Sequence, residues 1–373
     1  MDVSLRREDF STLPGWADDA PAQAFTAFRR SAERAIRTTP YRTGSLGLEH
    51  ADLEPAYAAA LSESGSLSDP SARDFFESWF RPVEICPGSD AGLVTGYYEP
   101  EIEVRSRPDA VFRYPFLRKP EALVPVPDPD TPPPAIPAGY AFMLDRRGIA
   151  TPCPDREAIE AGAFDGQALE IAWAASKVDV FFAHVQGCAR LRFADGRLLR
   201  INYAARSGHP FTAIGRLLVE RGELDAATVS MAAIRGWLAV DLERADRLMR
   251  ENRSYIFFKE TEIADESAGP VGAAGVSLEP GRSLAVDHRI HSFGTPIFVI
   301  AAGLADFDAP RPFSRLMIAQ DTGTAITGPV RGDLFAGSGP AAGDKAGSVK
   351  AAARFVVLAP WDSEMARRAG HER

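Results

Sequence analysis

The last third of the chain alternates short apolar runs with glycine-rich loops. The runs are rich in β-branched and aromatic residues, and they cover residues 283–286, 296–300, 316–319 and 354–358. Runs of this length and composition, bounded by turn-forming residues, are typical of β-strands. Many short strands separated by turns usually pack as a barrel or a sandwich, so this part of the chain predicts a β-rich core of one of these two kinds.

Helical signals come earlier in the chain. Apolar side chains recur near helical spacing at 21–36, and Pro70 precedes a second such segment at 71–80. Proline close to a helix start is favourable because the first helical N–H groups have no partner within the helix. Further helices are predicted at 210–220, 226–238 and 242–252. The expected fold class is therefore mainly β with peripheral helices.

The middle of the chain mixes strand signals with a proline-rich stretch. Strands are predicted at 179–184, 189–193, 198–203 and 254–258, and the pair Asp195-Gly196 predicts a hairpin turn between the second and third of these. Residues 120–137 are rich in proline, which cannot donate to a strand ladder. We therefore expect this stretch to be loop or linker.

Composition limits the classes of protein that fit. With 373 residues, two domains are expected at ~150 residues per domain. The formal net charge is −9, and no cluster of Lys and Arg supplies the basic surface that nucleic-acid binding requires, so we expect no nucleic-acid partner. The three cysteines, Cys86, Cys153 and Cys188, form no Cys-x-x-Cys pair, which argues against a thiolate zinc site. No segment has the ~18–20 continuous apolar residues of a membrane span.

The densest chemical signal lies at 318–339, IAQDTGTAITGPVRGDLFAGSG. Asp321 follows an apolar strand, Asp333 precedes Leu334, and glycines punctuate the whole stretch. Two carboxylates that converge perturb each other, so that one holds a proton near neutral pH. Such a group can act as a general acid, although Asp in a glycine-rich loop also serves as an ordinary turn residue. Both interpretations stay open on these residues alone.

Metal chemistry has weaker support. Asp287, His288 and His291 lie close together, but an i,i+3 pair of histidines without further ligands is a poor metal signature. We expect no metal site and no cofactor.

Two aromatic and polar segments could bind a sugar chain. Residues 94–100, VTGYYEP, contain Thr95 and Tyr98, and residues 179–187, DVFFAHVQG, contain Gln186. Hydroxyl, amide and aromatic groups suit sugar hydroxyls and ring faces, but taken singly these residues are as well explained by core packing.

Taken in order, six segments resemble the membrane-bound lytic murein transglycosylase A family. The six are VTGYYEP, YPFLRKP (114–120), DVFFAHVQGCARL, DGRLLRINYA, NRSYIFF (252–258) and GPVGAAGVSLEPGRSLAVD (269–287), and the region around Asp287, Asp321 and Asp333 in addition resembles a C-terminal three-aspartate domain. The resemblance runs from about Pro14 to Pro360. A single motif would say little, whereas their shared order is specific.

The resemblance implies a two-domain fold. A double-psi β-barrel domain would be built from residues 1–100 and 242–373, a smaller β domain from 101–241 would be inserted in it, and the glycan would lie in a groove between them. It further implies that Asp333 is catalytic with Asp321 as its partner, and that Thr95, Tyr98, Gln186, Gly187 and Asp287 bind substrate.

The implied reaction is cleavage of the β-1,4 bond between N-acetylmuramic acid and N-acetylglucosamine, with formation of a 1,6-anhydro ring. It would serve cell-wall turnover. One alternative is a non-catalytic, expansin-like protein that binds wall glycan. Another is an aspartic protease, because Asp321-Thr322-Gly323 matches that motif; a single copy would require a homodimer.

The resemblance also indicates partners and location. We expect a monomer that binds peptidoglycan glycan strands and is able to associate with other cell-wall enzymes. Because peptidoglycan lies outside the inner membrane, we expect a periplasmic or cell-envelope protein. The sequence MDVSLRREDF shows no export signal, so we expect upstream residues or a displaced start.

Overall fold

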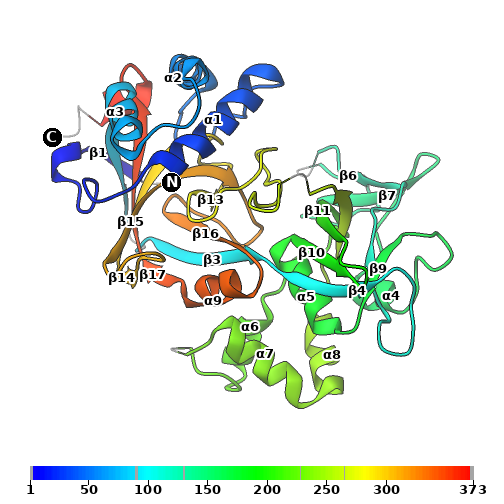
Figure 1. Cartoon of the computed structure of the whole chain (residues 1–373). Coiled ribbons are helices and arrows are strands. Elements are labelled where there is room, and N and C mark those ends of the chain that lie inside the picture. The colour runs from blue at the N-terminus through cyan, green and yellow to red at the C-terminus, as the bar shows by residue number, and fades with distance from the viewer. Residues whose placement is uncertain (1–2, 89–90, 129–130, 227, 264, 370–373) are drawn as a thin grey trace. The chain divides into compact units, whose positions relative to one another are not determined.

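The computed structural model describes residues 3–88, 91–128, 131–226, 228–263 and 265–369. The chain divides into two compact units, unit 1 (Met1–Tyr98 and Glu266–Arg373) and unit 2 (Glu99–Asp265). Both units combine β-sheet with helices, so the architecture is mixed (Figure 1). Among the described helices, none has the length and apolar character needed to cross a membrane.

Unit 1 is built on a nine-stranded mixed sheet. Its order is β1 (Val3–Arg7), β2 (Phe80–Pro87), β18 (Arg354–Pro360), β14 (Pro296–Ala305), β15 (Pro312–Asp321), β13 (Ser283–Val286), β16 (Arg331–Ser338), β3 (Leu93–Glu99) and β17 (Lys350–Ala352). All four strands expected in the last third of the chain are present. Strand β16, which carries Asp333, was not expected, because glycines interrupt its apolar pattern.

Helices pack against this sheet and bury their apolar faces on it. They are α1 (Ala22–Arg37), α2 (His50–Ser62), α3 (Asp69–Trp79), α9 (Pro340–Ser348) and α10 (Glu364–Arg368), with a short 3-10 turn η1 (Phe10–Thr12). The two helices expected in the first quarter are confirmed as α1 and α3. Phe28 of α1 is fully buried and packs edge-on against Phe76 and Phe80, with ring centroids 5.7 Å apart in both pairs. This aromatic contact joins α1, α3 and the sheet in one core.

A buried glutamine anchors the centre of the sheet to α1. The β13–β15 register shifts between Leu284 and Ala285, so that Gln320 is skipped in the pairing. The fully buried Gln320 amide donates to the carbonyl of Ala27 and to Ser31 Oγ, both at 2.8 Å. Its Oε1 accepts a hydrogen bond from Ser283 Oγ at 2.5 Å. A bulge of this kind inserts one residue and re-aims the next side chain, which here is Asp321.

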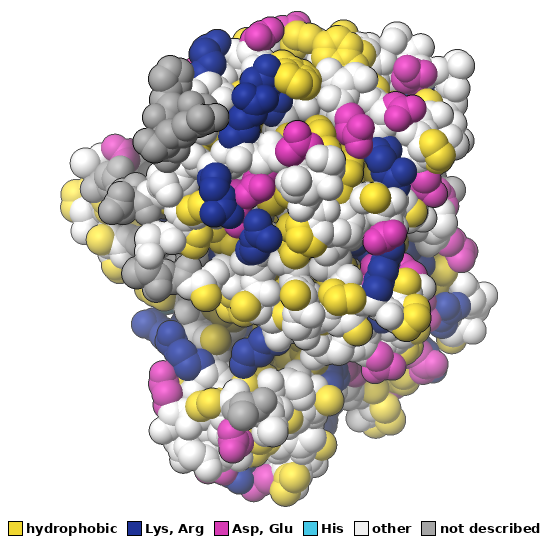
Figure 2. All heavy atoms as spheres, turned by 90° about the vertical axis from the view of Figure 1, so that its left-hand side faces the viewer, with side chains coloured by type: hydrophobic (Ala, Val, Ile, Leu, Met, Phe, Trp, Pro, Cys, Tyr) yellow, Lys and Arg dark blue, Asp and Glu magenta, His cyan; other side chains and the backbone are white. Residues whose placement is uncertain are grey.

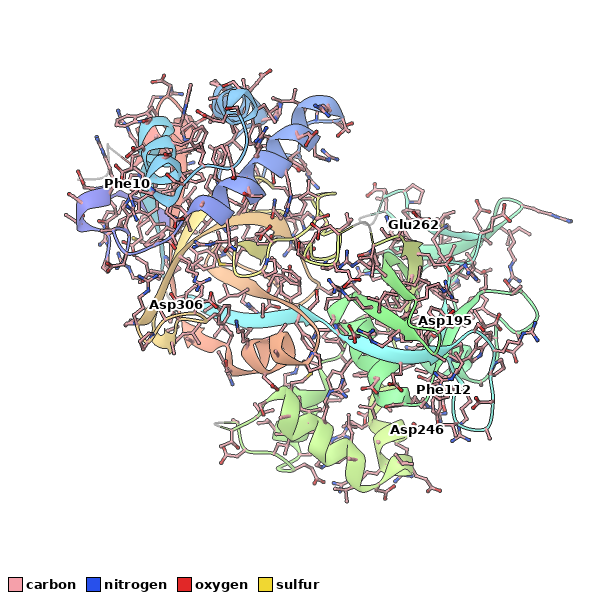
Figure 3. The ribbon with its side chains drawn as sticks, viewed as in Figure 1. Phe10, Phe112, Asp195, Asp246, Glu262 and Asp306 are labelled. Carbon is pink, nitrogen blue, oxygen red and sulfur yellow. The ribbon has the colours of Figure 1, made fainter. Side chains whose placement is uncertain are left out.

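Unit 2 contains two sheets. The larger has the order β12 (Ile256–Thr261), β11 (Leu198–Arg206), β10 (Cys188–Phe193), β4 (Glu101–Arg105), β9 (Glu170–Ala174) and β5 (Tyr114–Leu117). The smaller has the order β6 (Leu123–Pro125), β7 (Phe142–Arg146) and β8 (Ile149–Thr151). The expected Asp195-Gly196 turn joins β10 to β11, and its carboxylate accepts from Arg197 N at 3.0 Å (Asp195 is labelled in Figure 3).

The helices of unit 2 are α4 (Arg156–Glu160), α5 (Lys177–Gln186), α6 (Ile214–Glu220), α7 (Met231–Val240) and α8 (Leu242–Glu251). The expected inserted domain ended at residue 241, but unit 2 continues to Asp265. The reason is that β12 pairs with β11, which draws α8 and β12 into the sheet of this unit. The described residues of the proline-rich stretch are mostly loop and contribute one short edge strand, β6.

The strand predicted at 179–184 was wrong, because these residues belong to helix α5. Ser176 caps its first turn by accepting from Asp179 N, and Gly187 ends it in the left-handed conformation with φ 77°. A short apolar run cannot be assigned to strand or helix by periodicity alone. The flanking cap residues decide the assignment here.

Surface charge in the view of Figure 2 is mixed. On the face shown, Lys and Arg side chains are interspersed with Asp and Glu and with apolar side chains. No net field of one sign is therefore expected over that face.

The Gln320 anchor predicts a stability effect. Gln320→Met keeps a similar volume but removes the acceptor of the Ser283 hydroxyl and the two hydrogen bonds donated to Ser31 Oγ and the Ala27 carbonyl, which still contact each other at 3.4 Å. Orphaned buried polar groups cost about 1–3 kcal/mol, so urea unfolding followed by circular dichroism should show a loss of that size. Gln23→Met, at an exposed position of α1, is the matched control. Equal stability of the two variants would contradict the anchoring role.

Candidate active site

Two aspartates flank one residue of strand β13. Ala285 is paired with Asp333 of antiparallel β16 on one side and with Asp321 of parallel β15 on the other. Paired residues on neighbouring strands project to the same side of a sheet. The two backbones are therefore about 10 Å apart, two strand spacings, with their carboxylates on a common face. The side chain of Ala285 is small, so Tyr97, which belongs to the same apolar cluster as Ala285, can lie between the two carboxylates.

Asp333 is held by a threonine and an arginine. Its Oδ1 accepts a hydrogen bond from Thr95 Oγ1 of the adjacent strand β3. Arg331 Nη2 donates to the same threonine oxygen at 2.7 Å, and Arg331 Nη1 lies 3.7 Å from Asp333 Oδ1. Arg331 and Asp333 are two residues apart in β16, so their side chains lie on the same face of the strand. One fifth of the Asp333 side chain (20%) is exposed, so the carboxyl group can be reached from solvent.

Asp321 is held more tightly, by three donors. Oδ2 accepts from the Tyr97 hydroxyl at 2.9 Å. Oδ1 accepts from the backbone N–H groups of Ala273 at 3.0 Å and Thr322 at 2.9 Å. Gly272 permits this approach, since a Cβ there would lie 2.7 Å from the Gln320 carbonyl oxygen. The glycine-rich segment 269–275 therefore supplies a backbone donor to the site.

The two carboxyl groups differ in electrostatic surroundings. Burial raises the pKa of Asp333, while the positive charge of Arg331 and the hydrogen bond from Thr95 act in the opposite direction. Burial also raises the pKa of Asp321, against its three hydrogen bonds, and the negative charge of Asp333 raises it further. A carboxyl group with a raised pKa keeps its proton to a higher pH, and partial access to solvent allows it to pass that proton to a bound group. Asp333 meets both conditions.

Asp287 holds a loop beside the aspartates. It is buried, with both oxygens occupied by the Arg289 guanidinium at 2.8–2.9 Å, and Oδ2 also accepts from Gly328 N at 3.1 Å. Burial opposes ionisation here, but the bonds from Arg289 and Gly328 outweigh it and lower the pKa of Asp287. This geometry ties the turn after β13 to the loop that precedes β16.

The two histidines of this turn have structural partners. His288 Nδ1 lies 3.2 Å from Thr322 Oγ1, whose proton is donated to the Val286 carbonyl at 2.7 Å, so the imidazole is the donor. His291 Nε2 donates to the Pro329 carbonyl at 2.8 Å. Burial lowers the pKa of His291 to about 4. Among the described residues, no three His, Cys, Asp or Glu side chains are placed to share a metal ion.

The other residues expected to bind substrate belong to different units, Thr95 and Tyr98 to unit 1 and Gln186 and Gly187 to unit 2. Thr95 is in direct contact with Asp333. Tyr98 is half-buried and packs against Ala336 and the alanines of α9, on the side of β3 away from Thr95. Gln186 is the last residue of α5 in unit 2, and Gly187 is the left-handed cap that follows it.

Sequence patterns left three contributors to the site unidentified. Arg331 and Tyr97 each lie two residues from a residue that was identified, Asp333 and Thr95. In a strand this spacing places both members of a pair on one face, and that signal could have found them. The Ala273 N–H could not have been found, because a backbone donor leaves no mark in side-chain chemistry.

Comparison with known proteins gives consistent results along the chain. Residues 93–259 match the family model of the MltA specific insert domain, and residues 282–359 match that of the 3D domain. The membrane-bound lytic murein transglycosylase A of Vibrio cholerae is 34% identical over 285 residues, 72% of this chain and 68% of that protein. The Escherichia coli K12 protein of the same name is 34% identical over 272 residues, 71% of this chain and 64% of that protein.

Solved structures agree. A membrane-bound lytic murein transglycosylase from Agrobacterium tumefaciens has a TM-score of 0.89 at 47% identity, covering 96% of this chain and 98% of that one. Escherichia coli MltA with bound chitohexaose has a TM-score of 0.68 at 26% identity, covering 96% and 95%.

The geometry predicts how Arg331 affects Asp333. In Arg331→Gln the positive charge beside the carboxylate is lost, so the pKa of Asp333 should rise. A ¹³C NMR titration of the aspartate carboxyl carbons measures this directly. Arg7→Gln, at an exposed position of β1, should leave the Asp333 titration unchanged. An unchanged or lower pKa in Arg331→Gln would show that the guanidinium does not act on Asp333.

Proposed function

The chain belongs to the membrane-bound lytic murein transglycosylase A family, and from that premise we propose that Asp333 is the single catalytic carboxylate of a peptidoglycan lytic transglycosylase. The enzyme is a lyase that cuts murein glycan strands. The observation that carries the assignment is the position of Asp333, partly exposed, with a raised pKa, and held by Thr95 and Arg331.

The first step is proton donation. Protonated Asp333 gives its proton to the glycosidic oxygen between N-acetylmuramic acid and N-acetylglucosamine, and the bond from that oxygen to the muramic acid C1 breaks. Positive charge then develops at C1 and its ring oxygen. The Asp333 carboxylate left behind is stabilised by the Thr95 hydroxyl and the Arg331 guanidinium.

The second step closes a ring. The 6-hydroxyl oxygen of the same muramic acid attacks C1, and Asp333 takes up the hydroxyl proton, which returns the enzyme to its starting state. The product is a 1,6-anhydro sugar. Because no water is consumed, no second carboxylate is needed to activate one, unlike in inverting hydrolysis.

Asp321 acts through Asp333 in this proposal. Its carboxyl group, fixed by Tyr97 and two backbone donors, is coupled electrostatically to Asp333, so that a negative charge on either group raises the pKa of the other. Asp321 is thus a positioning and tuning residue.

Substrate contacts remain proposals. The complex of Escherichia coli MltA with chitohexaose supports binding of glycan strands by this chain. We propose Thr95, Tyr98, Gln186, Gly187 and Asp287 as the substrate-binding residues, and Asp287 would act through the adjacent loop, because Arg289 occupies both of its oxygens. We also propose that the sheet of unit 1 is a double-psi β-barrel, for which the mixed pairing of β13 between β15 and β16 is favourable. Finally, we propose that the protein is a monomer and that it associates with other cell-wall enzymes.

The two alternatives have distinct outcomes. An expansin-like protein would bind sacculi and release nothing. A dimeric aspartic protease would need two Asp-Thr-Gly motifs sharing a proton, and pepstatin would inhibit it. Asp321 instead has Tyr97 and backbone N–H groups as its partners within one chain.

The proposed mechanism predicts unequal effects of the two aspartates. Asp333→Asn should lower the release of anhydro-muropeptides by about 10²–10⁴-fold, since the titratable proton is lost. Asp321→Asn should lower it less and move the pH optimum downward, because removing a neighbouring negative charge lowers the pKa of Asp333. Mass spectrometry of soluble products from peptidoglycan, taken across pH, measures both.

Asp344→Asn, at an exposed site on α9, is the matched control and should behave as wild type. Products with reducing N-acetylmuramic acid ends would identify a hydrolase and refute the proposed reaction. Wild-type rates from Asp333→Asn would refute the assignment of the catalytic carboxylate.

Location is a further expectation. The named relatives are membrane-bound, and the proposed substrate lies outside the inner membrane, so we propose a cell-envelope location, in the periplasm. Fractionation of cells that express the protein from its native locus should place it in the envelope. A strictly cytoplasmic protein would contradict the expectation.

A further inference from the structure

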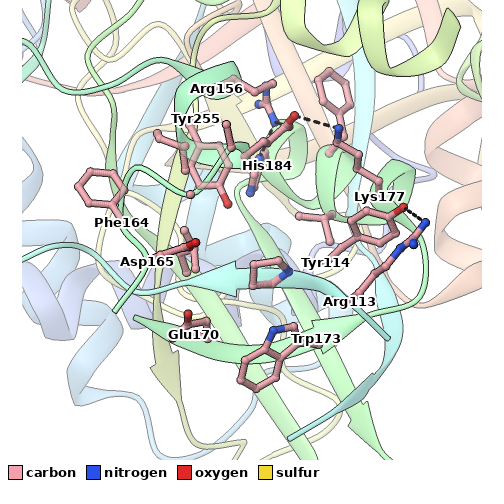
Figure 4. A pocket seen from close by; sticks show the side chains of 18 residues that line it. Arg113, Tyr114, Arg156, Phe164, Asp165, Glu170, Trp173, Lys177, His184 and Tyr255 are labelled. Carbon is pink, nitrogen blue, oxygen red and sulfur yellow. Dashed lines mark hydrogen bonds and ion pairs between the residues drawn. The ribbon is translucent and has the colours of Figure 1, made fainter. Parts of the chain in front are cut away.

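Unit 2 contains a pocket of about 440 Å³ that the proposed reaction does not use. Its walls come from β5, α4 with the turn that follows it, β9 and α5 (Figure 4). All of its lining residues lie within unit 2. Asp333, which belongs to unit 1, is not among them.

One set of charges in the wall neutralises itself. Lys177 Nζ lies 2.9 Å from both Glu160 Oε2 and Asp246 Oδ2. The buried Arg156 guanidinium lies 3.6 Å from Glu160, and it donates to the carbonyls of Asn252 and Ser254. These groups have partners and build the wall, so they do not require a ligand.

A second set of charges has no ionic partner in the described part of the chain. Asp165 and Glu170 are two such carboxylates, exposed and half-buried respectively. Arg113 is an exposed guanidinium that contacts Tyr114, through the hydroxyl at 3.0 Å and the ring at 5.2 Å. In Figure 4 the two carboxylates lie on one side of the pocket and Arg113 on the other. The pocket is thus polarised, negative on one side and positive on the other.

Flat apolar surfaces lie between these charges. Tyr114, Phe164 and Trp173 all line the pocket, and Phe164 is buried while the other two are half-exposed. Aromatic faces attract ammonium groups through the ring quadrupole, and they cover aliphatic chains. Together with Asp165 and Glu170, they suit a cationic group carried on an aliphatic stem.

The wall also contains an unpaired donor. Arg156 can only donate, so the contact of its Nη1 with His184 Nδ1 at 3.1 Å makes Nδ1 the acceptor. The neutral His184 ring then carries its proton on Nε2, which is buried without a hydrogen-bond partner in the described structure. Because this nitrogen is buried from solvent, it belongs to the wall of the pocket and is not one of the groups proposed to contact a ligand.

We propose that this pocket binds the peptide stem of peptidoglycan, at a group that carries both an ammonium and a carboxylate. Asp165 and Glu170 hold the ammonium, Arg113 holds the carboxylate, and Trp173 and Phe164 cover the aliphatic part. Peptidoglycan stems carry carboxylates, and an uncross-linked diamino acid side chain also ends in an ammonium beside one. The choice of a stem over another zwitterion rests on the proposed function.

Direct binding tests the pocket separately from catalysis. Isothermal titration calorimetry of the full chain would use a stem peptide with a free diamino acid side chain, and the same peptide acetylated on that ammonium. The free peptide should bind wild type, and the double variant Asp165→Asn with Glu170→Gln should weaken it about tenfold. Arg113→Gln should weaken it similarly, but should not change binding of the peptide amidated at the carboxylate. Glu121→Gln, exposed in unit 2 and outside the pocket, should bind as wild type.

The outcomes separate the two proposals. Loss of affinity on acetylation, together with loss in the double variant, supports the stem site. No binding to wild type, or equal binding of free and acetylated peptides, overturns it, and preferential binding of free lysine over the stem peptide assigns the pocket to another zwitterion. Release of anhydro sugars from peptide-free glycan strands, absent in Asp333→Asn, tests the proposed function alone, because that substrate has no stem.

Discussion

The bulge at Gln320 is the constraint on which the arrangement of the candidate site depends. Without the skipped residue, Gln320 would face Ala285 and Asp321 would turn away from Asp333. Instead the Gln320 amide turns to α1 and is satisfied by Ala27, Ser31 and Ser283. A fully buried amide cannot give up these partners without a large cost, so the bulge is fixed by the packing of α1 on the sheet. The helix expected from the first quarter of the chain thereby sets the register of a carboxylate from the last quarter.

The two aspartates illustrate how similar groups acquire different tasks. Asp321 has three donors and little freedom, whereas Asp333 has the Thr95 hydroxyl and the Arg331 guanidinium and keeps one fifth of its surface exposed. For Asp333, burial favours the neutral acid and Arg331 favours the carboxylate. A group that must first donate and then accept the same proton needs both influences, since either alone would trap one protonation state. The opposition between desolvation and a nearby cation is therefore functional in the proposed mechanism.

Strand β3 connects these features to unit 2. Thr95 and Tyr97 project from one face and reach Asp333 and Asp321. Two residues after Tyr97, the fully buried Glu99 begins unit 2 and accepts from Arg190 at 2.8 Å and from Arg200 at 2.5 Å. Buried charges need partners, so these contacts hold Glu99 against β10 and β11 within unit 2. One strand thus carries donors for the site and the anchor of the inserted unit.

The sequence alone determined the strands of the last third, the helices α1 and α3 and the Asp195-Gly196 turn, because these depend on local composition. It also singled out Asp321 and Asp333 as candidate site carboxylates, because motif order pointed to them. It did not determine helix α5, whose apolar run fits both periodicities, or the end of unit 2, which follows from the pairing of β12 with β11. It also left out Arg331, Tyr97 and the Ala273 N–H. The spacing of two residues along a strand could have indicated Arg331 and Tyr97, but not their long-range partners. The contacts of Arg331 with Thr95 and of Tyr97 with Asp321 join residues far apart in the chain, and strand register and a single bulge set them. Tertiary structure decided them, since a shift of one residue reverses the face on which a side chain lies.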